Sequence, residues 1–246
     1  MVGTETQGYE ADTRASGFAA APGASAVLAG SRLVAGERGP GLHVMTASDG
    51  TLAAEIDEVD RARAQQYRLL ALLLGRAPTC ETLARLSEIR GDASPLGLAH
   101  IALAQAATAA DPAALQREFF DLFVGVGRGE LLPFASYYLT GFLYDRPLAG
   151  LRHDLEQLGI AAGDELKDPE DHVAILCECM AGLASGEFGE GDEAVQRRFF
   201  ERHLKPWAAR FFADLEMARA AKFYRQVGAV GRMFMEIEAE AFAMDA

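Results

Sequence analysis

The chain has 246 residues, half of them hydrophobic, and its 36 acidic residues outnumber its 23 lysines and arginines, which gives a formal net charge of −13. This negative field repels phosphate backbones, so it argues against a nucleic-acid ligand and favours a basic partner. The chain is long enough to bury a substantial core, and we expect one main globular domain.

Residues 1–50 differ from the rest of the chain. They are rich in Gly, Ala and Ser and show no sustained period of about two or about 3.6 residues, so we expect a disordered tail. Acidic residues and no basic ones precede Arg14, which disfavours a secretory signal. Met45 stands just before the first periodic segment, so an upstream start codon can also explain the tail. Whether residues 1–44 belong to the native protein stays open.

Residues 51–246 are expected to form one all-helical domain. Apolar residues recur every three or four positions from Ile56 to Leu74, which predicts a helix that ends at Gly75 and Pro78. Side chains that can cap a helix start predict three more helices. These capping residues are Thr79, Ser94 before Pro95, and Asp111 before Pro112.

The helix that starts at Asp111 must end at a cluster of three glycines. Gly125, Gly127 and Gly129 follow its apolar stripe, and a helix of ordinary stability does not tolerate that density, so we expect a turn. The same cluster suggests a phosphate loop. No Lys-Ser or Lys-Thr follows it, however, and no strand precedes it, which favours the turn.

Further helices are predicted after this turn. One starts at Pro147 and ends before Gly159, one starts at Pro169 with Asp168 as its N-cap, and the C-terminal part of the chain is helical with a break at Pro206. No segment alternates convincingly with the period of a strand, and no internal repeat of solenoid length occurs. We therefore predict an all-α fold, a compact bundle of non-repeating helices.

Cysteine use and hydropathy bear on the compartment. The three cysteines, Cys80, Cys177 and Cys179, show no framework spacing, which argues against a disulfide-stapled secreted domain and fits a reducing, cytoplasmic setting. No apolar run is long enough to cross a bilayer, so we expect a soluble protein without membrane insertion.

The sequence lacks the usual motifs of catalysis and metal binding. Cys177 and Cys179 lie about 200° apart on a helix, so they cannot both face one metal, and we expect them in the core. None of the five histidines lies three or four residues from another, and no Gly-x-Ser-x-Gly elbow occurs. We predict no metal, no cofactor and no enzymatic activity.

Asp171 and His172 admit two interpretations. With Asp168 as N-cap, Asp171 stands at the third helical position, where a carboxylate complements the helix dipole. Alternatively, an acid and an imidazole at an exposed helix start offer a carboxylate for a guanidinium group and a ring for stacking. Both interpretations can hold together.

Three motifs, in order and at their spacing, carry a resemblance to a known family. They are residues 118–125 (EFFDLFVG), 132–138 (LPFASYY) and 169–172 (PEDH), with weaker matches at Arg63, Tyr67, Leu70, His203, Leu204, Trp207, Phe223 and Tyr224. The chain thereby resembles the TorD/DmsD family of chaperones for molybdenum-cofactor enzymes, from about residue 61 to residue 242. Val126 and Phe134 depart from the proline and tyrosine that the family shows more often.

The resemblance implies a cytoplasmic, non-enzymatic, all-helical chaperone, a monomer or homodimer. Its partner would be a molybdenum-cofactor oxidoreductase of the reductase or formate dehydrogenase type, bound through its twin-arginine signal peptide or its apo form while the cofactor is inserted before export. Asp171 and His172 would anchor the peptide. The full set of peptide-binding residues that the resemblance implies is Asp171, His172, Pro169, Glu118, Leu122, Phe123, Pro133, Ser136, Tyr137 and Tyr138.

Other functions stay open at this point. Asp171 and His172 could form the acid–base pair of an enzyme, which requires a concave pocket and a third, orienting group. The glycine turn could bind a guanine nucleotide weakly. The bundle could also be a helical interaction module without signal-peptide specificity.

Overall fold

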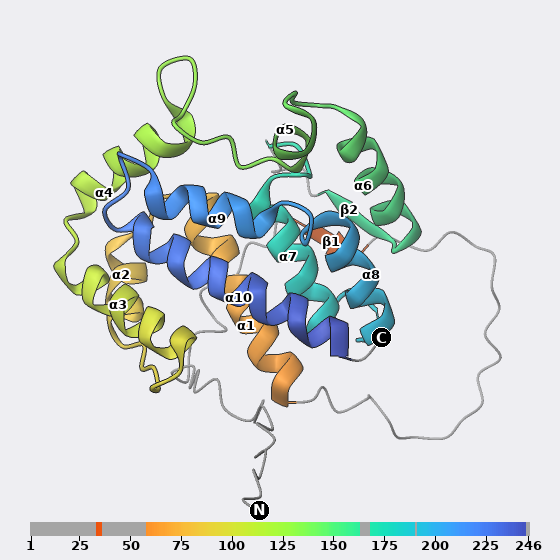
Figure 1. Cartoon of the computed structure of the whole chain (residues 1–246), viewed down its shortest axis with the longest axis horizontal. Coiled ribbons are helices and arrows are strands. Elements are labelled where there is room, and N and C mark those ends of the chain that lie inside the picture. Colours follow the sequence, from red (N-terminus) through yellow and green to blue (C-terminus); the bar gives the residue numbers. More distant parts are fainter. Residues whose placement is uncertain (1–32, 36–57, 163–167, 190, 245–246) are drawn as a thin grey trace, which may run out of the picture.

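The computed structural model describes residues 33–35, 58–162, 168–189 and 191–244 (Figure 1). Within these ranges the chain forms ten α-helices, one π-helix and two short strands, which confirms the predicted all-α bundle. The elements in chain order are β1 (Leu33–Ala35), α1 (Glu58–Gly75), α2 (Cys80–Ser87), α3 (Pro95–Ala109), α4 (Pro112–Phe119), the π-helix η2 (Phe120–Val124), α5 (Ala135–Thr140), α6 (Arg146–Gln157), β2 (Ile160–Ala162), α7 (Val173–Ala184), α8 (Glu193–His203), α9 (Ala208–Met217) and α10 (Tyr224–Met244).

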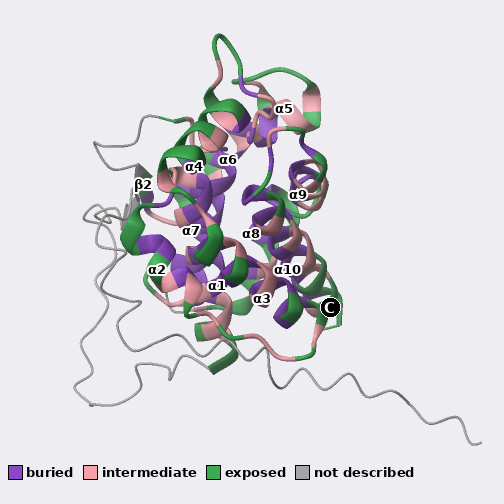
Figure 2. Cartoon of the chain, turned by 90° about the vertical axis from the view of Figure 1, so that its left-hand side faces the viewer, coloured by how far each residue is buried: buried purple, intermediate pink, exposed green. Residues whose placement is uncertain are grey.

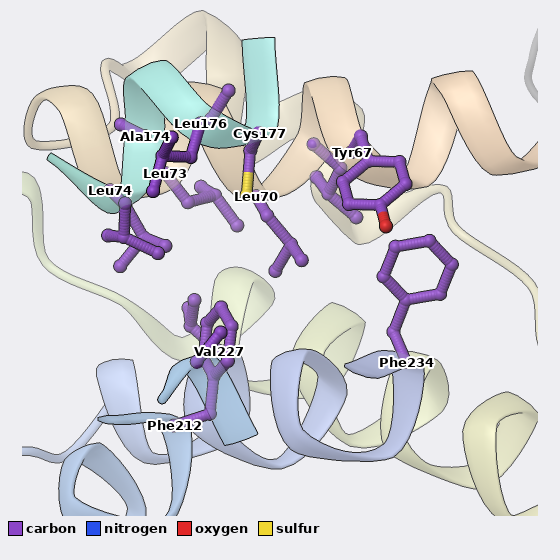
Figure 3. Packing of buried hydrophobic residues seen from close by; sticks show 14 of the residues in the cluster. Tyr67, Leu70, Leu73, Leu74, Ala174, Leu176, Cys177, Phe212, Val227 and Phe234 are labelled. Atoms are coloured by element: carbon purple, nitrogen blue, oxygen red, sulfur yellow. The ribbon is translucent and has the colours of Figure 1, made fainter. Parts of the chain in front are cut away.

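The bundle is built around α7. Nearly all of its residues are buried, as expected for a helix that is apolar all round, and Cys177 and Cys179 lie in the core as predicted. α1 packs along α7, and α10 packs along α9 (Figure 1). Tyr67 of α1 meets Phe234 of α10 edge-on, with the ring centroids 4.7 Å apart (Figure 3). α1 therefore joins α7 to the α9–α10 pair in one core.

A charged network ties α1 to α8 and α10. Arg63 Nε and Nη2 donate to the two carboxylate oxygens of Glu238 at 2.7 and 2.8 Å, and the Tyr67 hydroxyl donates to Glu238 at 2.8 Å. Arg63 Nη1 also donates to Gln196 Oε1 at 2.8 Å. Burial lowers the pKa of Arg63, but the hydrogen bonds and charge of Glu238 outweigh burial and raise that pKa. Arg63 therefore stays charged, with Glu238 as its buried partner.

The predicted helix caps at Thr79, Ser94 and Asp111 are confirmed. Each capping side chain accepts a backbone N–H in the first turn of the helix that it precedes. The acceptor and donor residues are Thr79 and Thr82 at 3.2 Å, Ser94 and Gly97 at 3.0 Å, and Asp111 and Ala114 at 2.9 Å. The predicted turn is confirmed as well, since Gly125 and Gly127 have φ angles of 64° and 87°. The break at Pro206 separates α8 from α9.

The predicted start of α7 is wrong. The helix begins at Val173, and its N-cap is His172, not Asp168. Asp171 therefore stands before the helix and not at its third position. The reason is tertiary, because the backbone of this stretch pairs with the residues that precede α5.

A small antiparallel sheet joins β1 to β2, with Leu33 opposite Ala162. The sequence did not predict it, since strands of three residues are too short to show a period. The rest of the predicted tail, residues 1–32 and 36–50, lies outside the described residues. None of the described helices is both long and apolar enough to cross a membrane.

Candidate functional site

The connections that precede α5 and α7 run antiparallel to each other. The Val173 N–H donates to the Pro133 carbonyl at 2.8 Å, and the Ala135 N–H donates to the Asp171 carbonyl at 3.0 Å. These bonds hold together two of the three motifs found in the sequence. The starts of α5 and α7 therefore form one structural unit, which we call the crossing (residues 133–136 and 170–173).

The Asp171 carboxylate caps α5 from outside that helix. Asp171 is only 1% exposed, and its Oδ2 accepts the Ser136 N–H at 2.8 Å. The residue that precedes α5, Phe134, provides no side-chain cap of its own. The carboxylate from the α7 connection thus satisfies a free N–H and places a negative charge at the positive end of α5.

Two polar atoms at the crossing are buried without a hydrogen-bond partner among the described protein residues. They are the second carboxylate oxygen of Asp171, Oδ1, and the hydroxyl of Ser136, which is fully buried. A buried polar group left without a partner costs about 1–3 kcal/mol. The crossing can therefore still accept a hydrogen bond at Asp171 and both donate and accept one at Ser136.

His172 is also buried, with 6% of its surface exposed. Its Nδ1 accepts the Ala174 N–H at 3.1 Å, which places the proton of the neutral ring on Nε2. The ring meets Phe134 edge-on, with the centroids 5.0 Å apart. The expectation of an exposed acid–imidazole pair is therefore wrong, because both side chains are buried and each accepts a backbone N–H.

The charged group that does reach solvent at the crossing is Glu170. Arg152 of α6 holds its carboxylate with Nε, 3.1 and 3.0 Å from the two oxygens, and with Nη2 at 2.8 Å. The side chain of Arg152 is 56% exposed and that of Glu170 is 18% exposed. The hydrogen bond to Glu170, followed by the charge of Glu170 and then that of Asp171, raises the pKa of Arg152.

An open depression of about 410 Å³ lies on the α6 face next to this ion pair. Its lining residues are Tyr144, Leu148, Ala149, Arg152, His153 and Glu156. The α5–α6 connection beside it carries large apolar side chains in solvent, with Phe142 72% and Tyr144 71% exposed. The site thus combines a carboxylate with exposed aromatic surface.

A sequence profile described as "Nitrate reductase delta subunit" matches residues 90–213, which is 124 of the 246 residues. The chain belongs to the TorD/DmsD family. The resemblance found in the sequence is thereby confirmed.

Named relatives of this TorD-family chain are chaperones. It is 28% identical over 138 residues to "Chaperone protein TorD" of Vibrio atlanticus (strain LGP32), which covers 52% of this chain and 64% of the relative. The TorD of Vibrio vulnificus (strain CMCP6) is 29% identical over 166 residues, 61% of this chain and 77% of the relative. The TorD of Vibrio cholerae serotype O1 (strain ATCC 39315) is 33% identical over 106 residues, 39% of this chain and 48% of the relative. The matched stretch thus spans about half to three quarters of these relatives.

A solved structure, named as a proposed redox enzyme maturation protein from Archaeoglobus fulgidus, aligns with 71% of this chain and 93% of its own. The TM-score is 0.46 and the sequence identity is 19%.

Tyr138 of the TorD-family motif faces α9. Its hydroxyl donates to Asp214 Oδ2 at 3.0 Å, and its ring lies 5.3 Å from Trp207 and 5.8 Å from Phe211. Burial, together with the charge of Asp214, raises the pKa of Tyr138. Tyr138, itself half-buried, therefore anchors α5 to the bundle.

The structure does not bring the first TorD-family motif to the crossing. Glu118 Oε1 accepts the Lys222 and Tyr224 N–H groups at 2.7 and 2.8 Å, at the start of α10. Leu122 is fully buried in the core, and the Phe123 ring packs 5.3 Å from the Tyr224 ring. These three residues hold α4 and η2 against α10, to the left of α5 in Figure 1.

Sequence reasoning missed three residues with evident roles. Glu130 accepts the Arg219 and Ala220 N–H groups at 2.8 and 3.0 Å, which holds the α9–α10 connection. These hydrogen bonds lower the pKa of Glu130, with the bond from Arg219 first among the causes. Arg152 and Glu170 were missed because their pairing joins α6 to the connection before α7, 18 residues along the chain. The position of Glu170 within the PEDH motif was the one signal that could have found it.

Proposed function

We propose that this protein is a cytoplasmic chaperone for a molybdenum-cofactor oxidoreductase, which it binds through the twin-arginine signal peptide or the apo form before export. Membership of the TorD/DmsD family and the chaperone names of its relatives support this proposal. The observation that carries it is the crossing, where the partly exposed carboxylate of Glu170 stands next to the buried carboxylate of Asp171, which caps α5. The net charge of −13 favours long-range attraction of a basic peptide.

Within the crossing, the buried residues and the partly exposed residue have different roles. Glu170 is the carboxylate that a peptide arginine can reach, and a planar guanidinium can bind both of its oxygens. Asp171 and His172 act behind it, since the Asp171 carboxylate caps α5 and the His172 ring packs against Phe134. The exposed aromatic residues of the α5–α6 connection suit the apolar stretch of a signal peptide. Figure 2 shows exposed chain, drawn in green, beside α5 near the top of the molecule.

Calorimetric titration with signal peptides tests the proposal. Wild type should bind a peptide with two arginines more tightly than the same peptide with two lysines, because an ammonium group lacks the planar fork. Glu170→Gln should weaken binding of the arginine peptide about tenfold, which corresponds to about 1.4 kcal/mol.

The matched control is Glu81→Gln. Glu81 also accepts a hydrogen bond from an exposed arginine, Arg85 Nη2 at 2.8 Å, but it lies on α2. Equal loss of affinity in both variants would mean that net charge alone attracts the peptide. Unchanged affinity in Glu170→Gln would place the peptide elsewhere on the bundle.

A further inference from the structure

We propose that Arg152 fills, in the free protein, the position on Glu170 that an arginine of the bound peptide takes. Arg152 would then compete with the peptide for Glu170, and this competition would lower the affinity of the site for the peptide. This inference rests on the proposed function, since it concerns the same site.

The geometry of the pair supports this substitution. Arg152 presents Nε and Nη2, one edge of its guanidinium plane, to the carboxylate of Glu170 at 2.8–3.1 Å. An arginine from another chain would use the same fork on the same two oxygens. Both guanidinium groups cannot occupy this edge of the carboxylate together, so binding of one releases the other.

Arg152 is placed so that it can leave. More than half of its side chain is exposed, and an ion pair of this exposure contributes little to stability. Its long stem stands on α6, whereas Glu170 belongs to the connection that the backbone bonds of the crossing hold in place. A peptide that adds apolar contacts to its arginine can therefore displace Arg152.

The released guanidinium has a second carboxylate within its reach along α6. Glu156 follows Arg152 by one helical turn, at the i,i+4 spacing that lets oppositely charged side chains meet. Both residues line the open depression on α6, which gives the side chain room to turn. Exchange from Glu170 to Glu156 would keep Arg152 paired while the peptide is bound.

Titration of Arg152→Gln with the arginine peptide measures the competition. Because exposed ion pairs are worth about 0.2–1 kcal/mol, removal of Arg152 should tighten binding about 1.5-fold to fivefold. The ratio between the arginine and lysine peptides should not change, since an internal competitor lowers both affinities by the same factor. In a Glu170→Gln background the same substitution should produce no such gain.

The control is Arg146→Gln, which removes the same charge from the same helix at an exposed position without touching Glu170. The effect of competition is the gain in peptide affinity of Arg152→Gln beyond the gain of Arg146→Gln. No excess gain, or an equal gain in the Glu170→Gln background, would overturn the inference and leave the proposed function standing. Failure of wild type and both arginine variants to bind the peptide would overturn the proposed function and this inference with it.

Discussion

Replacement of Asp171 by Asn distinguishes two possible roles of this residue, a cap of α5 and a direct ligand of the peptide. In the folded protein this carboxylate is buried, and it accepts the Ser136 N–H at 2.8 Å. Asn keeps the shape and one oxygen acceptor but removes the charge. We expect a less stable protein whose affinity for the arginine peptide falls less than that of Glu170→Gln.

The magnitude follows from the interactions that disappear with the charge. The charge at the helix N-terminus contributes about 0.3–1 kcal/mol, and the charged hydrogen bond is stronger than a neutral one by about 1 kcal/mol. The free energy of unfolding should fall by about 1–2 kcal/mol, which lowers the Tm by about 2–8 °C.

Urea denaturation, thermal melts and titration of the same preparations provide the assay. Asp111→Asn is the control, because Asp111 caps α4 at an exposed site and Asn caps a helix about as well as Asp. That variant should unfold within a few tenths of a kcal/mol of wild type. An Asp171→Asn protein that melts like wild type, yet loses peptide binding as strongly as Glu170→Gln, would refute the cap and make Asp171 a direct ligand.

Three further outcomes are expected. Glu238→Gln should destabilise the fold by about 1.5–3 kcal/mol in urea melts, because Arg63 loses its charged hydrogen bonds to the buried carboxylate and keeps its ion pair with Asp60, 2.6 Å from Nη1; a loss below about 1 kcal/mol would contradict this. Burial lowers the pKa of His100 from its usual 6.5 to about 4, so the unfolded chain binds more protons between these values and stability falls as the pH falls through them. Stability curves against pH should therefore lose up to about 3 kcal/mol on the acid side, and His100→Gln should flatten that slope. A chain that starts at Met45 lacks β1, and since three ladder residues contribute little, its Tm should drop by no more than about 2–4 °C.

The helix starts that the sequence predicted correctly depend on local chemistry. Ser94 and Asp111 each stand before a proline, and each accepts an N–H only three residues away. Such a cap needs no other part of the chain, so its signal is complete in a few letters of sequence.

The prediction of the start of α7 was wrong for the opposite reason. Asp168 and Pro169 form a valid local start signal, but the backbone groups of Asp171 and Val173 pair with residues that precede α5. The same long-range pairing removed the predicted exposure of His172. A sequence read one segment at a time contains no information on which distant backbone competes for these groups.

The motif residues lie in two separate places in the structure, and the sequence could not show this for a related reason. Pro133, Ser136 and Asp171 meet at the crossing, whereas Glu118 fastens the start of α10 through two backbone N–H groups. A family pattern preserves residues that build the scaffold as readily as residues that contact a ligand. Only burial and hydrogen-bond partners distinguish the two, and neither can be read from spacing.

Two adjacent carboxylates, one buried and one partly exposed, determine how binding can be transmitted through this bundle. Asp171 ties the α7 connection to α5 by a buried hydrogen bond, while Glu170 ties it to α6 by an exposed ion pair. A peptide arginine on Glu170 would loosen the second tie and leave the first intact, because the backbone bonds of the crossing do not involve Arg152. The response to the peptide would therefore appear in α6 and the α5–α6 connection, not in the packing of α7 against α1.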